Sequence, residues 1–190
     1  MKESRNRPAP DEIERFVRAF PEASFFHTPA WLDSLAAAFP RFEVFWLTER
    51  ERGALAGAMP VARISRGPLF HLLSLPFGAY GDPLALSGSA RDALFERFFA
   101  LARSPLCLTA GIQLFGGGVP GALPRGAVAR MEECRLVRLE GGIEEVWKRT
   151  SGKRRQLARR GERAGLDVRF LEREEEIRRF HAIYARESRG

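Results

Sequence analysis

The residues best suited to bind an anion are concentrated between positions 148 and 163 of the chain. This segment holds eight basic residues and one acid, Glu162, so its formal charge equals the +7 of the whole chain. The basic residues are Lys148, Arg149, Lys153, Arg154, Arg155, Arg159, Arg160 and Arg163. Because the remaining residues are formally neutral together, the concentration indicates a local anionic partner rather than a general aid to solubility.

On a helical wheel these cations gather on one side of the predicted helix. Arg155, Gln156, Arg159 and Arg163 line that side, Lys153 and Arg160 flank it, and Trp147, Leu157, Ala158, Gly161 and Ala164 occupy the opposite sector. Guanidinium groups three and four residues apart present forks that fit phosphate or carboxylate oxygens. The alternative is a solvated charged face. Six like charges repel one another and have only Glu162 as an intrahelical partner, which favours an anion-binding face.

A turn between residues 74 and 83 is the second candidate site. A predicted strand breaks there at Pro76, and the Gly-rich turn leaves Phe77 and Tyr80 beside exposed backbone donors. Such a turn can line a binding cleft. The alternative is a tight connection whose two aromatic rings plug the edge of the core, and spacing alone slightly favours that alternative.

The sequence offers no recognisable metal site, phosphate loop or catalytic triad, and the catalytic residue stays unknown. His27, His71 and His181 are widely separated, and the two cysteines lack Cys-x-x-Cys spacing. No Lys-Ser/Thr pair follows the glycines at 116–118. Neither a signal peptide nor an apolar run of membrane-spanning length is visible, so we expect a cytoplasmic protein with no integral membrane association.

The elements that must position these residues follow from hydrophobic periodicity and from breaks at Gly and Pro. We predict helices over 13–20, 29–39 and 89–103, and strands over 42–48, 54–64, 69–75, 106–115 and 127–139. This order predicts an α/β (α+β) sandwich around a mixed, largely antiparallel sheet, with residues 1–140 forming one domain.

The pattern changes after residue 140. We predict a long polar helix over 143–164, a short strand over 166–171 and a helix over 174–188. Because these elements bury little apolar surface on their own, we expect residues 141–190 to be an interdomain basic helix and the beginning of a second, truncated domain.

Two motifs carry a resemblance to a known family. Residues 151–165, SGKRRQLARRGERAG, resemble the S-x-K-x-R-N-x-I-R-K-A-x-K-x-G segment that joins the two GNAT domains of FemAB-like proteins. The matching positions are Lys153, Arg155, Arg159, Arg160, Arg163 and Gly165, while Gln156, Ala158 and Gly161 depart from the pattern. The turn at 74–83 is similar to the family's S-x-P-F-x-x-Y-G-G loop, with Asp82 in place of the second Gly. Trp31 falls on a P-x-W element of the same family.

The chain therefore resembles the N-terminal part of a FemAB-like or BioF2-like acyltransferase of the GNAT superfamily. The resemblance implies a GNAT-like fold and transfer of an acyl or aminoacyl group, from acyl-CoA or aminoacyl-tRNA as co-substrate, to an amine acceptor in cell-wall (peptidoglycan) or exopolysaccharide metabolism. It implies no tightly bound cofactor and no metal, and it allows contact with tRNA. If the second domain is truncated, this part alone is expected to be inactive.

The resemblance also implies roles for particular residues. Substrate would contact Phe77, Tyr80, Gly81, Asp82 and Trp31. Phosphate groups would be held by Lys153, Arg155, Arg159, Arg160 and Arg163.

Two other functions of the basic segment remain open. A nucleic-acid-binding protein could use the helix within 148–163 to follow phosphates, although the basic residues are not interleaved with stacking aromatics. Attachment to anionic lipid is the other, although the opposite side of the helix is too weakly apolar to embed deeply.

Overall fold

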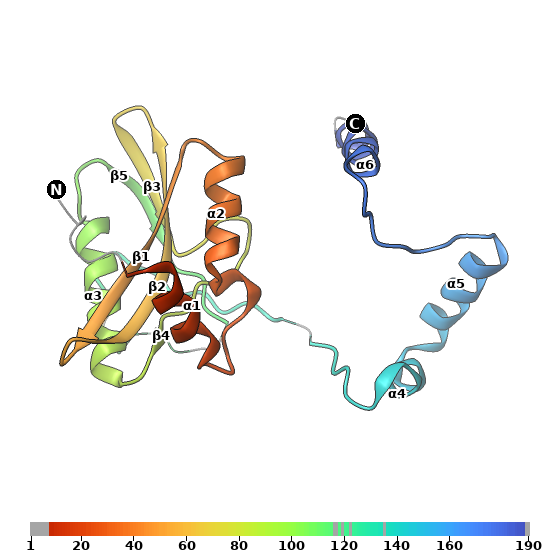
Figure 1. The fold of residues 1–190 in the computed structure, drawn as a ribbon, viewed down its shortest axis with the longest axis horizontal. Helices are drawn as coiled ribbons and strands as arrows, with labels where there is room; N and C mark the ends of the chain where they lie inside the picture. The colour runs from red at the N-terminus through yellow and green to blue at the C-terminus, as the bar shows by residue number, and fades with distance from the viewer. Residues whose placement is uncertain (1–7, 116–117, 119, 122, 135, 189–190) are drawn as a thin grey trace. The chain divides into compact units, whose positions relative to one another are not determined.

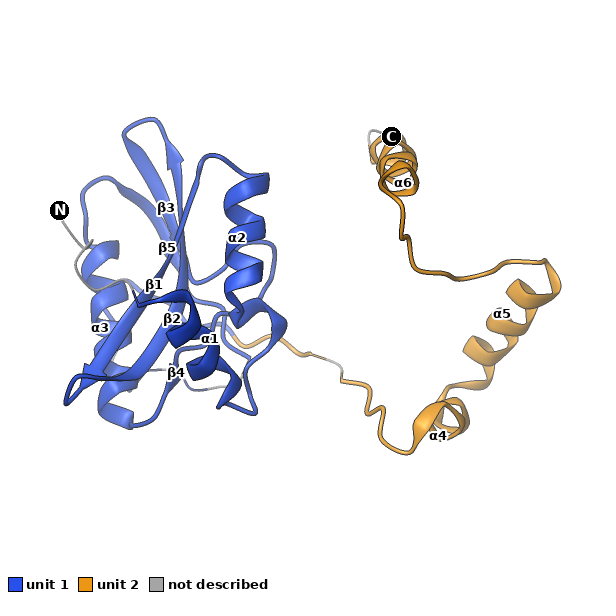
Figure 2. Cartoon of the chain, in the orientation of Figure 1, with its two compact units in different colours: residues 1–130 blue, residues 131–190 orange. Residues whose placement is uncertain are grey.

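The computed structural model describes residues 8–115, 118, 120–121, 123–134 and 136–188. The chain divides into unit 1, residues 1–130, and unit 2, residues 131–190 (Figure 2). This division falls ten residues before the domain boundary expected from the sequence.

Unit 1 is built on a mixed sheet. Strands β1 (Phe42–Glu51), β2 (Ala54–Arg66), β3 (Leu69–Leu73) and β5 (Cys107–Gly111) lie side by side in that order, and β4 (Leu84–Ala85) pairs with β2. The pairs are antiparallel except for β3 with β5, which is parallel. The predicted α/β class and the largely antiparallel sheet are thus confirmed, and the strands predicted over 42–48, 54–64 and 69–75 are present.

Short-range chemistry fixes the turns and helix starts of unit 1. Arg52 and Gly53 both have positive φ, 50° and 84°, as a two-residue β-hairpin requires. Helix α2 (Pro29–Ala38) begins where the Thr28 hydroxyl accepts a hydrogen bond from the Trp31 N–H, with Pro at its first position. Helix α3 (Gly88–Ala102) begins where the Ser87 hydroxyl accepts from the Ala90 N–H.

Helices cover both faces of the sheet (Figure 1). Helix α3 buries Leu94 and Phe98 against one face. Helix α1 (Pro10–Arg18), the 3₁₀ turn η1 (Phe25–His27) and α2 lie on the other. Burial of each such Leu or Phe side chain contributes roughly 1.5–3 kcal/mol to folding, so these two layers hold the sheet in place.

Two predicted strands differ from the structure. The strand predicted over 106–115 is shorter, since β5 ends at Gly111. The strand predicted over 127–139 is wrong, because none of the described residues in that range belongs to a strand, and all of them are exposed. A strand needs a neighbouring strand to satisfy its N–H and C=O groups, and no strand pairs with the described residues of this range.

Unit 2 consists of helices and connecting coil in its described part: α4 (Gly142–Arg149), α5 (Gly152–Arg163) and α6 (Glu174–Glu187). The single helix predicted over 143–164 is interrupted, because Thr150 and Ser151 are extended, with ψ of 135° and 147°. The strand predicted over 166–171 is wrong, since this segment is coil. No described residue of unit 2 is buried.

Candidate anion-binding helix and substrate loop

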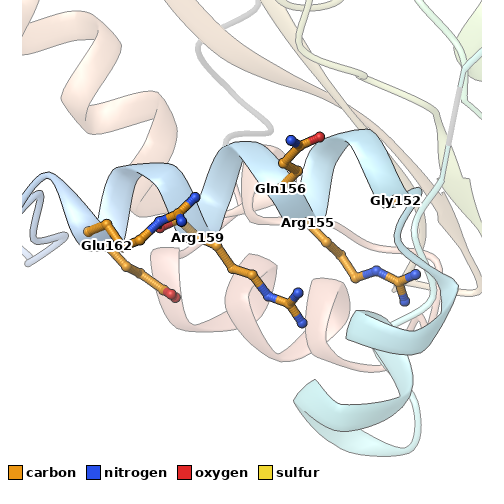
Figure 3. Close-up of a pocket in the computed structure, with 6 residues that line it drawn as sticks. Gly152, Arg155, Gln156, Arg159 and Glu162 are labelled. Atoms are coloured by element: carbon orange, nitrogen blue, oxygen red, sulfur yellow. The ribbon is translucent and has the colours of Figure 1, made fainter.

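Helix α5 carries all five residues predicted to hold phosphate. Its Arg155, Arg159 and Arg163 line a shallow concavity together with Gly152, Gln156 and Glu162 (Figure 3). The spacings of three and four residues bring these side chains onto one side of the helix. Lys153 and Arg160 are exposed on the same helix but are not part of the concavity.

Backbone carbonyls orient two of the three arginines. The Arg155 Nη1 atom donates to the carbonyl oxygens of Trp147 and Lys148, at 3.4 and 3.3 Å, in the last turn of α4. Cations are favoured there because the carbonyls of a helix C-terminus have no intrahelical partner. The Arg163 Nε atom donates to the Arg159 carbonyl oxygen at 3.3 Å. Each guanidinium has five N–H donors, so both keep several for a ligand.

No cation of α5 has a carboxylate partner among the described residues, whereas some cations of the neighbouring helices do. In α4, Lys148 pairs with Glu145 at 2.6 Å, and in α6, Arg178 pairs with Glu174 at 2.6 Å. Among the described residues, no carboxylate forms an ion pair with any of the six cations of α5. Helix α5 therefore presents positive charge that the rest of the described chain does not neutralise.

The two aromatic residues of the substrate loop have different surroundings. Phe77 is 66% exposed, has a φ of 64°, and lies with its ring centroid 5.1 Å from that of Phe39. Tyr80 is half-buried, with its ring centroid 4.9 Å from that of Phe115. Phe77 is therefore the more accessible of the two predicted substrate contacts.

Gly81 and Asp82 hold the loop in place. A Cβ atom on Gly81 would lie 2.9 Å from the Ser74 Cβ atom, closer than real side chains approach. The Asp82 carboxylate accepts a hydrogen bond from the Phe115 N–H, with its two oxygens 2.9 and 3.0 Å from the nitrogen. The carboxylate fixes the backbone beside Tyr80, which is a task that a second Gly at position 82 could not perform.

Trp31 reaches the same region from helix α2. It packs against the buried cluster that contains Leu75 and Ala79 of the loop, and its ring lies 5.4 Å from that of Phe26. The indole Nε1 atom is buried and has no hydrogen-bond partner among the described residues. Trp31 and the loop thus share one end of unit 1, whereas the cations of α5 belong to unit 2.

His27 is a residue of this region to which the sequence assigns no particular role. It is buried, its Nδ1 atom accepts a hydrogen bond from the Ser24 N–H at 3.1 Å, and its Nε2 atom donates to the Asp82 carbonyl oxygen at 3.1 Å. Burial lowers the pKa of His27, and the hydrogen bond and charge of Asp82 partly oppose that effect. The Ser-x-x-His spacing could have indicated the contact between Ser24 and His27. The contact between His27 and Asp82 has no local signal, because the two residues are 55 positions apart.

A second pair of polar side chains was also missed. The His71 Nδ1 atom and the Thr109 Oγ1 atom are hydrogen-bonded at 2.8 Å across β3 and β5. Nothing local in the sequence links two residues 38 positions apart, because the contact depends on the parallel pairing of these strands.

Within the described residues, no group of three or more His, Cys, Asp or Glu side chains could hold a metal ion. Over that same part of the chain, none of the helices has the length and apolar character needed to cross a membrane. A scan against protein-family models found no match for the chain, and searches of the curated proteins and of the solved structures found none either.

Proposed function

We propose that this chain is part of a cytoplasmic FemAB-type acyltransferase of the GNAT superfamily, and that α5 binds the phosphate groups of the activated donor. The donor is acyl-CoA or aminoacyl-tRNA, and the acceptor is an amine in cell-wall or exopolysaccharide metabolism. One observation carries this proposal: no cation of α5 has a carboxylate partner among the described residues, whereas Lys148 of α4 and Arg178 and Arg186 of α6 each have one.

Acyl transfer to an amine asks mainly for positioning. The amine attacks the donor carbonyl carbon, and hydrogen-bond donors stabilise the negative charge that develops on the carbonyl oxygen. Phosphates held by α5 would anchor the donor at a distance from the reacting bond. Hydrogen bonds to charged groups contribute about 1.5–3 kcal/mol each, so three arginines suffice for measurable affinity.

On the acceptor side, the loop residues divide into two groups. Phe77 and Tyr80 are the direct substrate contacts, because their rings are at least partly accessible. Gly81, Asp82 and Trp31 act as positioning residues, since each is engaged with neighbouring backbone or with the buried cluster.

Nucleic-acid binding is the second candidate, and the distribution of charge on α5 favours it. Lys153, Arg154 and Arg160 are exposed outside the concavity, so the helix is basic over more than one side. A helix of this kind can follow the phosphates of a single strand, with an affinity that falls steeply as salt is added.

Binding by the purified full chain distinguishes the two functions. The ligands are coenzyme A and a labelled single-stranded RNA of random sequence, each titrated at two salt concentrations. We expect R155Q/R159Q/R163Q to weaken coenzyme A binding at least about tenfold, because about 1.4 kcal/mol of lost interaction is sufficient for that change. The matched control is R178Q/R179Q/R186Q, which removes the same charge from α6.

The outcomes separate cleanly. Loss of coenzyme A binding in the α5 variant alone supports the donor site. Equal loss in both variants would mean that net charge, not the α5 surface, governs binding, and would contradict the proposal. Tight binding of the random RNA that neither coenzyme A nor tRNA displaces preferentially would instead support the nucleic-acid function, whereas preferential displacement by tRNA would support an aminoacyl-tRNA donor.

A further inference from the structure

Four side chains form one row across the sheet of unit 1. The register pairs Phe42 of β1 with Ile64 of β2, Ile64 with His71 of β3, and His71 with Thr109 of β5. Residues that pair directly across strands project to the same face, so the four side chains share it. Phe42, Ile64 and His71 are half-buried, and Thr109 is exposed.

Helix α2 covers the neighbouring part of this face but not this row. Its Leu32 and Leu35 pack with Val44 and Trp46. These two residues lie two and four positions after Phe42 along β1, so they share its face of the sheet. The helix ends at Ala38, and the chain then turns into β1. The row therefore lies past the end of the covering helix, on a part of the sheet that solvent reaches.

An open aromatic cluster borders the row. The Phe42 ring stacks on Phe39 at 4.8 Å between centroids and lies 6.0 Å from Phe77. Phe77 is 66% exposed. Its φ of 64° is one that non-glycine residues seldom adopt. Holding such a residue in that conformation costs free energy, and strain of this kind gathers at ligand sites.

The other end of the row is polar and carries no carboxylate. This end is formed by the hydrogen-bonded pair of His71 and Thr109. His71, the nearer of the two, lies two strand spacings from Phe42, roughly 10 Å away. Arg66 lies two residues after Ile64 along β2 and therefore projects to the same face, where it is exposed. The acid of β1 nearest the row, Glu43, projects to the opposite face and pairs with Arg63 at 3.1 Å.

We propose that this row is a binding site for a small aromatic carboxylate. The flat ring would lie against Phe77, Phe39 and Phe42, because aromatic rings favour offset or tilted contacts with one another. The carboxylate would lie near Arg66 and the His71 and Thr109 pair. No described strand residue that projects to this face is an acid, so the Arg66 guanidinium is complementary to that negative charge.

The site is separate from the donor site proposed on α5. It needs unit 1 only, and Phe77 is the one residue that it shares with the acceptor loop. Binding there neither requires nor demonstrates acyl transfer.

The probe is 2-naphthoate, titrated into the isotopically labelled full chain and followed by NMR. We expect saturable shifts of the Phe42, His71 and Thr109 signals, and an affinity about threefold to tenfold weaker in Phe77→Ala, as loss of one ring contact implies. The matched control is Phe25→Ala. Phe25 is 61% exposed and packs on Trp31 instead, so its loss should leave the affinity unchanged.

Two further variants sharpen the test. Arg66→Gln should weaken 2-naphthoate binding but leave binding of the uncharged 2-naphthylmethanol unchanged. R155Q/R159Q/R163Q should retain 2-naphthoate binding, so failure of the donor site and failure of this site are distinguishable.

Three results would overturn the inference. One is the absence of shifts along the row, and another is an equal loss of affinity in Phe77→Ala and Phe25→Ala. The third is sedimentation showing a dimer that Phe77→Ala dissociates, since a second copy of the chain would then be the occupant of this face.

Discussion

Apolar and basic residues have different surroundings in unit 1 and unit 2. In unit 1 apolar residues are buried in three clusters against the sheet, and several arginines pair with acids of other elements, such as Arg50 with Glu12 at 2.7 Å. In unit 2 no described residue is buried, and apolar side chains such as Ile177 and Phe180 are half exposed. Unit 1 thus buries much of its apolar surface within itself, whereas the described part of unit 2 leaves most of its apolar side chains exposed.

The secondary structure of unit 1 is stabilised by its buried core, whereas the described helices of unit 2 have no buried core to stabilise them. Isolated helices shorter than about 12–15 residues are marginal in water, and the described helices of unit 2 contain 8, 12 and 14 residues. Because none of these helices has a buried residue to support it, we expect them to gain stability from a bound ligand or partner. A ligand that neutralises α5 should therefore order unit 2 while leaving unit 1 unchanged.

The largest effect that tests this comparison comes from the core of unit 1. Leu94 is fully buried against β1, β2 and β3, so Leu94→Ala should lower the free energy of unfolding by about 2–5 kcal/mol in a urea titration. The control is Phe180→Ala in α6, where the side chain is 58% exposed and the change should stay within about 0.5 kcal/mol. A large loss in Phe180→Ala would show that α6 is buried in solution and would remove the contrast.

A smaller effect is expected from pH. Burial lowers the pKa of His27, so the unfolded chain binds a proton more readily than the folded chain does. Stability of unit 1 should therefore fall as pH drops below about 6.5, and the loss should stop growing below the folded pKa. The acids that face His27, Asp82 and Glu22, reduce this loss because both favour the protonated ring.

The measurement is the urea midpoint of unit 1 at several values between pH 7.5 and 5. His27→Gln keeps a polar side chain but cannot titrate. The urea midpoint of this variant should therefore depend less on pH than that of the unmodified chain. An unchanged slope in His27→Gln would assign the pH dependence to other groups. Unit 2 has no buried titratable group among its described residues, and its helix content should stay constant over this range.

The smallest effect concerns backbone strain at Phe77. Phe77→Asn and Phe77→Ala both remove the ring, but Asn tolerates the left-handed conformation better than Ala does. The Asn variant should be more stable than the Ala variant by about 0.5–1 kcal/mol in the same titration. Equal stabilities would mean that the positive φ is relaxed in solution.

Local signals predicted much of unit 1. Thr28 and Pro29 mark the start of α2, and the alternation in 42–48 and 54–64 marks β1 and β2. The two-residue strand β4 was missed because so short a segment has no periodicity to detect. The predicted strand over 127–139 failed because β-formers make a strand only when a neighbouring backbone accepts their hydrogen bonds.

The candidate sites divide in the same way. The cationic side of α5 follows from spacing alone, since Arg155, Arg159 and Arg163 are related by helical geometry. The break between α4 and α5 lies at the extended Thr150 and Ser151, just before Gly152, and was missed because basic residues continue on both sides of it. Contacts such as His27 with Asp82 depend on the tertiary fold, which no local pattern in the sequence records.

The close approach of Gly81 to Ser74 has a consequence for variation of this chain. Since a Cβ at position 81 would meet the Ser74 Cβ at 2.9 Å, neither position can be chosen independently of the other. Ser74 is itself fully buried, and its hydroxyl accepts a hydrogen bond from the Gln113 N–H at 3.0 Å, so a smaller residue there would give up that bond. A Cβ at position 81 would also lie 3.1 Å from the Ser74 carbonyl carbon, which no side-chain change at position 74 removes, so homologues that keep this loop should keep glycine at position 81.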